Sequence, residues 1–128
     1  MRRLLAAAVV VAMVTPAGAT EWIACTADGD AASANILVGM VDVLSIASAN
    51  VEAAGKKWAT DAEGDAKIIV GQAFEDAETI HVDFTDAGVS AVVAQLRLFK
   101  ATEGDSDATG GILRVPGVGA WAVSCSGP

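Results

Sequence analysis

The segment AWAVSC at positions 120–125 alternates between larger side chains and small ones along its whole length. Successive side chains of a β-strand point to opposite faces, so Trp121 and Cys125 share one face. The segment EWIAC at positions 21–25 alternates in the same way and also ends on a cysteine, Cys25. We therefore expect a strand near each end of the chain, with both cysteines pointing toward the core.

The two cysteines are the only ones in the chain and lie 100 positions apart. An even number of cysteines in an exported protein fits one disulfide, and closing so long a loop is worth about 4 to 5 kcal/mol. A redox-active pair would need close spacing such as CxxC, and a structural zinc site would need more ligands than two thiols and His81. We expect a structural disulfide between Cys25 and Cys125.

Residues 1–19 have the composition of a secretory signal peptide. Arg2 and Arg3 precede an apolar stretch at 4–14, and small residues lead up to a cleavage position after Ala19. A membrane-spanning helix needs about 20 apolar residues, which is more than this stretch contains. Cleavage is therefore favoured over a retained membrane anchor.

Lipid attachment at Cys25 is an alternative, because a small residue precedes that cysteine. Thr20 and Glu21 lie where a lipoprotein signal should still be apolar, so we do not favour it. Cleavage after Ala19 leaves 109 of the 128 residues, the size of one domain. We expect residues 20–128 to form a single periplasmic or extracellular β-rich domain with no membrane span.

The charge of this domain is strongly negative. Without Arg2 and Arg3, six basic residues stand against sixteen acidic ones, a formal charge of −10. Nucleic acid and anionic bilayers need clustered Lys and Arg, so the composition disfavours both. A basic protein or a metal ion is a partner that this charge attracts, although acidic loops also serve solubility alone.

Short apolar runs separated by acidic loops with glycine predict an antiparallel β-sandwich or a small barrel. The expected strands include 21–25, 35–41, 66–74, 79–84, 95–101, 112–116 and 120–125. Pro116-Gly117 suits a type II turn and predicts a C-terminal hairpin. The short segment 75–78 predicts a second hairpin, because the runs on both sides of it alternate.

One short helix is expected at about 86–95, with Asp86 as its N-cap. Helical spacing over about two turns is shown by Val89, Val92, Val93 and Leu96. The segment 43–54 is ambiguous, because Asp42 could cap a helix there or the chain could form two strands that turn near Gly55. We favour strands, because Val and Ile prefer extended backbone.

The residues that carry chemistry are few. His81 lies two positions from Asp83 and on the same strand face, but the chain has neither a GxSxG motif nor a spare cysteine to serve as a nucleophile. We expect a solvated His and Asp pair on the outside of the domain. No catalytic signature is present in the sequence.

Asp105, Asp107 and Thr109 occupy alternate positions before a glycine, as in the first half of an EF-hand calcium loop. The glutamate that should close such a loop falls at Pro116, and flanking helices are not expected. A calcium-binding or carbohydrate-active domain that uses the acidic loops is therefore the alternative function.

Trp58 follows Lys56 and Lys57 in the most basic part of the domain. These three residues are a candidate partner contact, while a core position is the commoner place for a tryptophan in a small domain. We expect a small exported, non-catalytic β domain that contacts another envelope macromolecule, for example as an inhibitor of a basic cell-wall hydrolase.

Overall fold

The computed structural model describes residues 20–40 and 43–127, so the expected signal peptide at 1–19 lies outside the described residues. The described chain is all β apart from two short 3-10 turns, η1 (Asp28–Asp30) and η2 (Gly64–Ala66). Its strands are β1 (Thr20–Ala27), β2 (Ala32–Met40), β3 (Leu44–Ala53), β4 (Lys56–Ala59), β5 (Ile68–Glu75), β6 (Thr79–Asp86), β7 (Val92–Glu103), β8 (Ser106–Val115) and β9 (Gly119–Ser126). No helix in these two ranges has the length and apolar character needed to cross a membrane.

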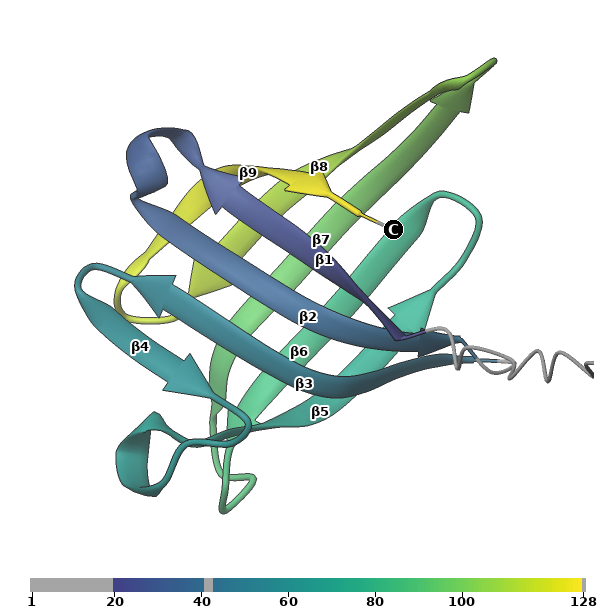
Figure 1. The fold of residues 1–128 in the computed structure, drawn as a ribbon. Helices are drawn as coiled ribbons and strands as arrows, with labels where there is room; N and C mark the ends of the chain where they lie inside the picture. The colour runs from purple at the N-terminus through teal and green to yellow at the C-terminus, as the bar shows by residue number, and fades with distance from the viewer. Residues whose placement is uncertain (1–19, 41–42, 128) are drawn as a thin grey trace, which may run out of the picture.

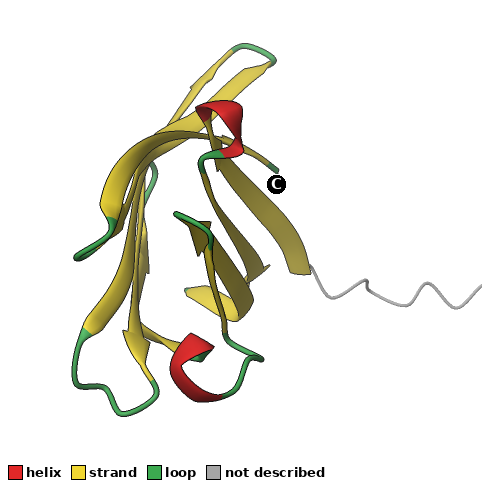
Figure 2. Cartoon of the chain, turned by 90° about the vertical axis from the view of Figure 1, so that its left-hand side faces the viewer, coloured by secondary structure: helices red, strands yellow, loops and turns green. Residues whose placement is uncertain are grey.

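The nine strands form one antiparallel sheet in the order β4-β3-β2-β1-β9-β8-β7-β6-β5. Each pair of neighbouring strands in the sheet is also consecutive along the chain, with one exception. The exception is the pair of β1 and β9, the first and last strands of the chain, which lie side by side within the sheet (Figure 1). The sheet curls into a near-closed barrel, with its walls facing one another across the core (Figure 2). The sequence therefore predicted the class correctly, and the structure selects the barrel.

The seam of the barrel lies between β4 and β5. An odd number of alternating strands leaves one pair running in the same direction, and here that pair is β4 and β5. Parallel strands that follow one another need a long crossover to pair fully, and the short connector at 60–67 does not provide one. Within the described residues, one parallel bridge spans the seam, between Ala59 and Lys67.

The barrel interior is filled by side chains from alternate positions of the strands. In β6, every second residue from Ile80 to Phe84 is buried, as the alternation predicted. The other buried apolar residues are Ile23, Cys25, Ala27, Ala32, Ala34, Ile36, Val38, Ala49, Val51, Ala53, Ile68, Ala94, Leu96, Leu98, Leu113, Val115 and Val123. Together they form one apolar core inside the barrel.

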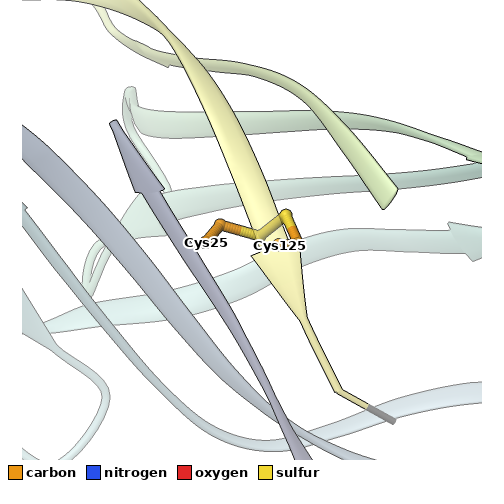
Figure 3. Close-up of a disulfide and its surroundings, with 2 residues drawn as sticks. All are labelled: Cys25 and Cys125. Carbon is orange, nitrogen blue, oxygen red and sulfur yellow. A yellow bond between two sulfur atoms is a disulfide. The ribbon is translucent and has the colours of Figure 1, made fainter. Parts of the chain in front are cut away.

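The predicted disulfide is present. Cys25 of β1 and Cys125 of β9 are register partners, and their sulfur atoms are bonded at 2.05 Å (Figure 3). Trp121 packs against the core on the same face as Cys125, as the alternation of AWAVSC predicted. The bond joins the first and last strands and leaves no thiol at Cys25 for lipid attachment.

Both predicted hairpins are confirmed. At the turn between β8 and β9, Gly117 has a φ of 78°, and the Val118 N–H donates to the Val115 carbonyl at 2.9 Å. This is the type II geometry that Pro116 and Gly117 favour. Between β5 and β6, the Asp76 N–H donates to the Thr79 carbonyl at 3.0 Å.

The helix expected at about 86–95 is wrong. Asp86 ends β6, its carboxylate accepts hydrogen bonds from the Ser90 N–H and hydroxyl, and its own N–H donates to the Ala91 carbonyl. Val89 has a φ of 55°, in the left-handed region that an α-helix excludes. Asp86, which is a good helix N-cap, therefore stabilises a turn instead. Burying alternate residues of β7 in the barrel stabilises the strand more than two turns of amphipathic helix would stabilise a helix.

The ambiguous segment 43–54 is extended, as we favoured. Leu44–Ala53 form β3, and the chain turns at Ala54 and Gly55 into β4. Asp42, the alternative helix cap, lies outside the described residues.

Candidate interaction surfaces

The hairpin of β7 and β8 extends beyond the strands on both sides of it. Register pairs join β6 to β7 only as far as Phe99, and β9 pairs with β8 only from Thr109 onward. Residues 101–108 are all exposed, and Figure 1 shows this hairpin projecting from the barrel. We call residues 101–108 the arm.

The arm carries the first two candidate calcium ligands, and the third follows it. Asp105 lies in the turn at the arm's tip, and Asp107 accepts a hydrogen bond from the Thr102 hydroxyl at 2.7 Å. Thr109 lies within the sheet, as a register partner of both Lys100 and Cys125. In the part of the chain that the structure describes, no three His, Cys, Asp or Glu side chains gather to hold a metal, so the calcium hypothesis rests on the sequence alone.

The turn between β5 and β6 adds acidic groups at the base of the arm. The Lys100 N–H donates to the Glu78 carbonyl at 2.7 Å, which places this turn beside β7. The Lys100 ammonium pairs with Glu75 at 3.3 Å, and no described residue forms an ion pair with Glu78, Glu103 or Asp105. We call Glu78, Glu103 and Asp105 the acidic end of the barrel.

The acidic residues do not all converge on this end. Asp28 and Asp30 lie in η1 between β1 and β2, and Asp61, Glu63 and Asp65 lie in the connector from β4 to β5. Much of the negative charge therefore surrounds the whole barrel, and a contact at the acidic end must be separated experimentally from the effect of net charge.

Two turn aspartates have a structural role. Hydrogen bonds from the Glu78 N–H and from the Thr79 hydroxyl and N–H lower the pKa of Asp76 below its ordinary value. Hydrogen bonds from the Ser90 hydroxyl and N–H likewise lower the pKa of Asp86. Both carboxylates hold a hairpin turn in shape, because they accept bonds from backbone N–H groups that the sheet leaves unpaired.

We expect Asp86→Ala to lower the melting temperature at pH 7, because the turn from β6 to β7 loses its acceptor. The pKa of Asp86 in the folded protein lies below the ordinary pKa of an aspartate, so this stabilisation is present above the ordinary pKa and is lost as the pH falls through the folded pKa. The difference in melting temperature from the parent should therefore shrink between pH 5 and pH 2. Asp61→Ala, which removes an exposed carboxylate of the connector, is the control, and an equal effect of both changes would contradict this role.

The three residues of the candidate contact around Trp58 do not form one exposed patch. Trp58 is partly buried and packs against the core, whereas Lys56 and Lys57 are exposed on β4. Lys57 pairs with Glu52 at 3.4 Å, across the register from it on β3. Both lysines line an open hollow of about 200 Å³ with Asp30 and Glu52, so no cationic patch with an aromatic centre forms there.

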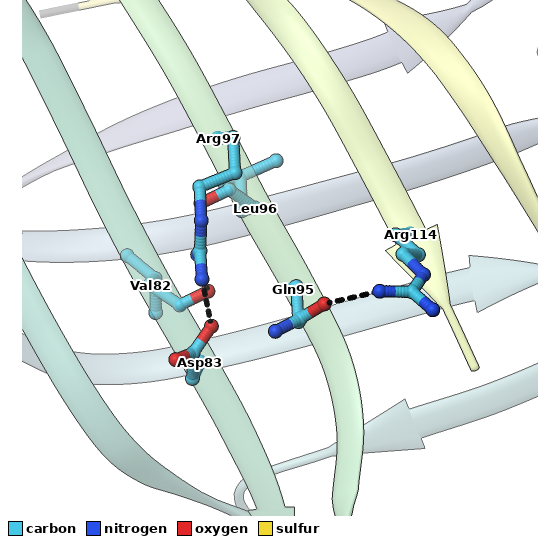
Figure 4. Close-up of polar contacts among 6 residues, drawn as sticks. All are labelled: Val82, Asp83, Gln95, Leu96, Arg97 and Arg114. Atoms are coloured by element: carbon cyan, nitrogen blue, oxygen red, sulfur yellow. Dashed lines mark hydrogen bonds and ion pairs between the residues drawn. The ribbon is translucent and has the colours of Figure 1, made fainter.

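His81 and Asp83 do not act as a pair. Asp83 Oδ1 lies 2.8 Å from Arg97 Nη2, and this ion pair neutralises an oxygen that is otherwise buried without a hydrogen bond (Figure 4). The His81 ring instead lies 6.1 Å from the Phe74 ring. The expected solvated His and Asp pair is therefore replaced by one ion pair and one aromatic contact.

The outer face of β7 and β8 was missed by the sequence reasoning. Phe99 and Ile112 are 66% and 46% exposed. Arg114 donates to Gln95 Oε1 at 3.3 Å on the same two strands (Figure 4). In the run QLRLFKA, the buried residues are Leu96 and Leu98. Phe99 therefore points outward from an alternating strand. The alternation of QLRLFKA, with Leu96 and Leu98 pointing inward, could have predicted this exposure from the sequence.

No protein-family model, no curated protein and no solved structure matches this chain.

Proposed function

We propose that the protein is a small exported, non-catalytic β domain that contacts a basic macromolecule of the cell envelope through its acidic end. The observation that carries this proposal is the arm, an exposed hairpin that projects from the barrel and bears carboxylates without cationic partners. Projecting loops on a rigid scaffold are common binding elements. Inhibition of a basic, lysozyme-type cell-wall hydrolase is the most concrete form of this role.

The charge of the domain supports such a partner. The two cations nearest the acidic end are already engaged, since Lys100 pairs with Glu75 and Arg97 with Asp83. Carboxylates that keep their charge unpaired attract a basic surface and speed its association, especially at low ionic strength. The exposed arm offers these carboxylates on the outside of the barrel.

The acid-base groups give a reason to propose a non-catalytic role. His81 is the only histidine of the chain, and the nearby Asp83 is engaged by Arg97. Both thiols are consumed in the disulfide. General acid-base or nucleophilic catalysis needs such groups within reach of one another and of a substrate.

The test measures binding of a purified basic lysozyme-type hydrolase to the oxidised domain 20–128. The double change Glu78→Gln with Asp105→Asn removes two charges from the acidic end, and Asp61→Asn with Glu63→Gln removes two from the connector. We expect the first pair to raise Kd about tenfold at low ionic strength and the second pair to change it less than threefold, since exposed ion pairs are each worth up to about 1 kcal/mol.

The same binding should weaken as salt is raised from about 20 to 200 mM, because exposed charges are screened over that range. Equal losses from the two double variants would show that net charge alone attracts the hydrolase. Failure of the parent domain to retain the hydrolase at low ionic strength would overturn the proposed partner.

A further inference from the structure

The outer face of β1, β2 and β3, three strands that lie side by side in Figure 1, carries no charge. Its outward positions form three rows across the strands, at 20, 22 and 24 on β1, 39, 37 and 35 on β2, and 45, 48 and 50 on β3. None of these nine residues is charged, although charged residues make up 19% of the chain. We call these nine residues the uncharged face. Its partner must be recognised by hydrogen bonds and apolar contact rather than by charge.

An exposed tryptophan lies on this face. Trp22 is 48% exposed, whereas the other two tryptophans, Trp58 and Trp121, pack against the core. Tryptophan is highly buried on average in folded proteins, so such an exposed ring is unusual. β9 pairs with β1 only from Ala24 onward and does not extend beside Trp22, which leaves the indole ring open to a ligand.

The only two asparagines of the chain lie next to each other on the same face. Asn35 and Asn50 are register partners on β2 and β3, and Asn35 Nδ2 donates to Asn50 Oδ1 at 2.9 Å. Among the described residues, no group donates to Asn35 Oδ1 or accepts from Asn50 Nδ2. Asparagine is depleted in strands, so strand propensity does not explain this pair. The two amides hold each other in place and present one acceptor and one donor side by side.

From these observations we propose that the uncharged face binds a neutral glycan chain that carries N-acetyl groups. The C–H face of a sugar ring packs against the apolar surface of Trp22, whose register partner Leu37 continues that surface. An acetamido group has one N–H and one C=O, which complement Asn35 Oδ1 and Asn50 Nδ2. A few placed polar groups beside an aromatic ring are the usual composition of a small-molecule site.

A glycan fits this face better than a protein does. The core of a protein interface is rich in large apolar and aromatic residues, and the uncharged face has only Trp22 and Leu37 of that kind. The other seven residues are small or carry hydroxyl and amide groups, which both donate and accept hydrogen bonds as sugar hydroxyls do. A flat sheet covers one side of its ligand only, so we expect a Kd of about 1 mM.

The experiment is a nuclear magnetic resonance titration of the ¹⁵N-labelled, oxidised domain 20–128 with the tetramer of N-acetylglucosamine. We expect shifts of the Trp22 indole N–H and of the Asn35 and Asn50 side-chain amides, and at least a tenfold higher Kd for Trp22→Ala. Phe99→Ala is the matched control, because Phe99 is 66% exposed but lies on β7, and it should change Kd less than twofold. Far-ultraviolet circular dichroism verifies that both variants fold.

The amide pair is tested separately. Asn35→Ala with Asn50→Ala should raise Kd at least tenfold, whereas Gln95→Ala, which removes an outward amide of β7, should change it less than twofold. The parent should bind the glucose tetramer, which lacks N-acetyl groups, at least tenfold more weakly. Equal binding of the two tetramers would overturn recognition of the N-acetyl group. No shifts at about 10 mM tetramer, or equal effects of Trp22→Ala and Phe99→Ala, would overturn the site.

This inference goes beyond the proposed function, and the two can fail separately. The titration contains no hydrolase, and the hydrolase test changes Glu78 and Asp105, neither of which belongs to the uncharged face. Glycan affinity should change less than twofold between about 20 and 200 mM salt, because no charge takes part, whereas the contact of the acidic end weakens over that range. A strong salt dependence of glycan binding would overturn recognition by the uncharged face.

Discussion

Replacing both Cys25 and Cys125 by alanine is expected to lower the free energy of unfolding by about 4 kcal/mol and the melting temperature by about 15 °C or more. The disulfide joins β1 to β9, the pair of strands that holds the two ends of the meander together. Without it, the denatured chain regains the freedom of a loop of about 100 residues, and the barrel loses the covalent joint between its first and last strands.

The measurement is thermal and urea unfolding of the domain 20–128, with and without a reducing agent. Reducing the parent protein should bring it close to the double variant, while the double variant itself should not respond to the reductant. This comparison separates the bond from the loss of two sulfur atoms from the core. A parent whose melting temperature does not change on full reduction would contradict a stabilising role for the disulfide.

Gly111→Ala is expected to destabilise the barrel by about 3 kcal/mol or more. A Cβ atom at position 111 would overlap the Arg97 carbonyl oxygen and lie 3.0 Å from Leu98 Cα. Both contacts are with backbone atoms of β7, which no rotamer change can move aside. β8 would have to separate from β7, and the hydrogen bonds between these two strands would be strained or lost.

Gly39→Ala in β2 is the matched control. Its added Cβ would meet nothing closer than 3.9 Å, and its φ is not in the left-handed region. We expect this change to be neutral or to stabilise the fold slightly, since alanine restricts the unfolded chain more than glycine does. The stability of both variants is measured by their unfolding midpoints in urea. Similar midpoints for Gly111→Ala and Gly39→Ala would contradict the expected clash between β8 and β7.

The close approach at Gly111 also bears on the proposed contact at the arm. The arm belongs to the same pair of strands, and Gly110 and Gly111 lie between the arm and Ile112. Gly110 is equally restricted, since a Cβ there would lie 2.9 Å from the Val123 carbonyl oxygen of β9. The arm therefore extends from a point where β7, β8 and β9 leave no room for an added side chain.

Local pattern was sufficient for the features that depend on one strand or one turn. Alternation located the inward faces of β1, β6 and β9, and Pro116 and Gly117 identified the C-terminal turn, because side-chain direction and turn geometry follow from neighbouring residues. The disulfide was also predictable, because only one pairing of two cysteines exists. The segment 86–95 was not, since Asp86 caps a helix or a turn equally well until the rest of the sheet is in place.

By itself, the sequence determined that the domain is mostly β, the two hairpins and the covalent joint between the ends of the chain. Only the tertiary structure decided the closure into a barrel with its seam between β4 and β5 and the projection of the arm. These features depend on register between strands far apart in the chain, and a shift of one residue exchanges the inner and outer faces. That register is set by how all nine strands fill one common core.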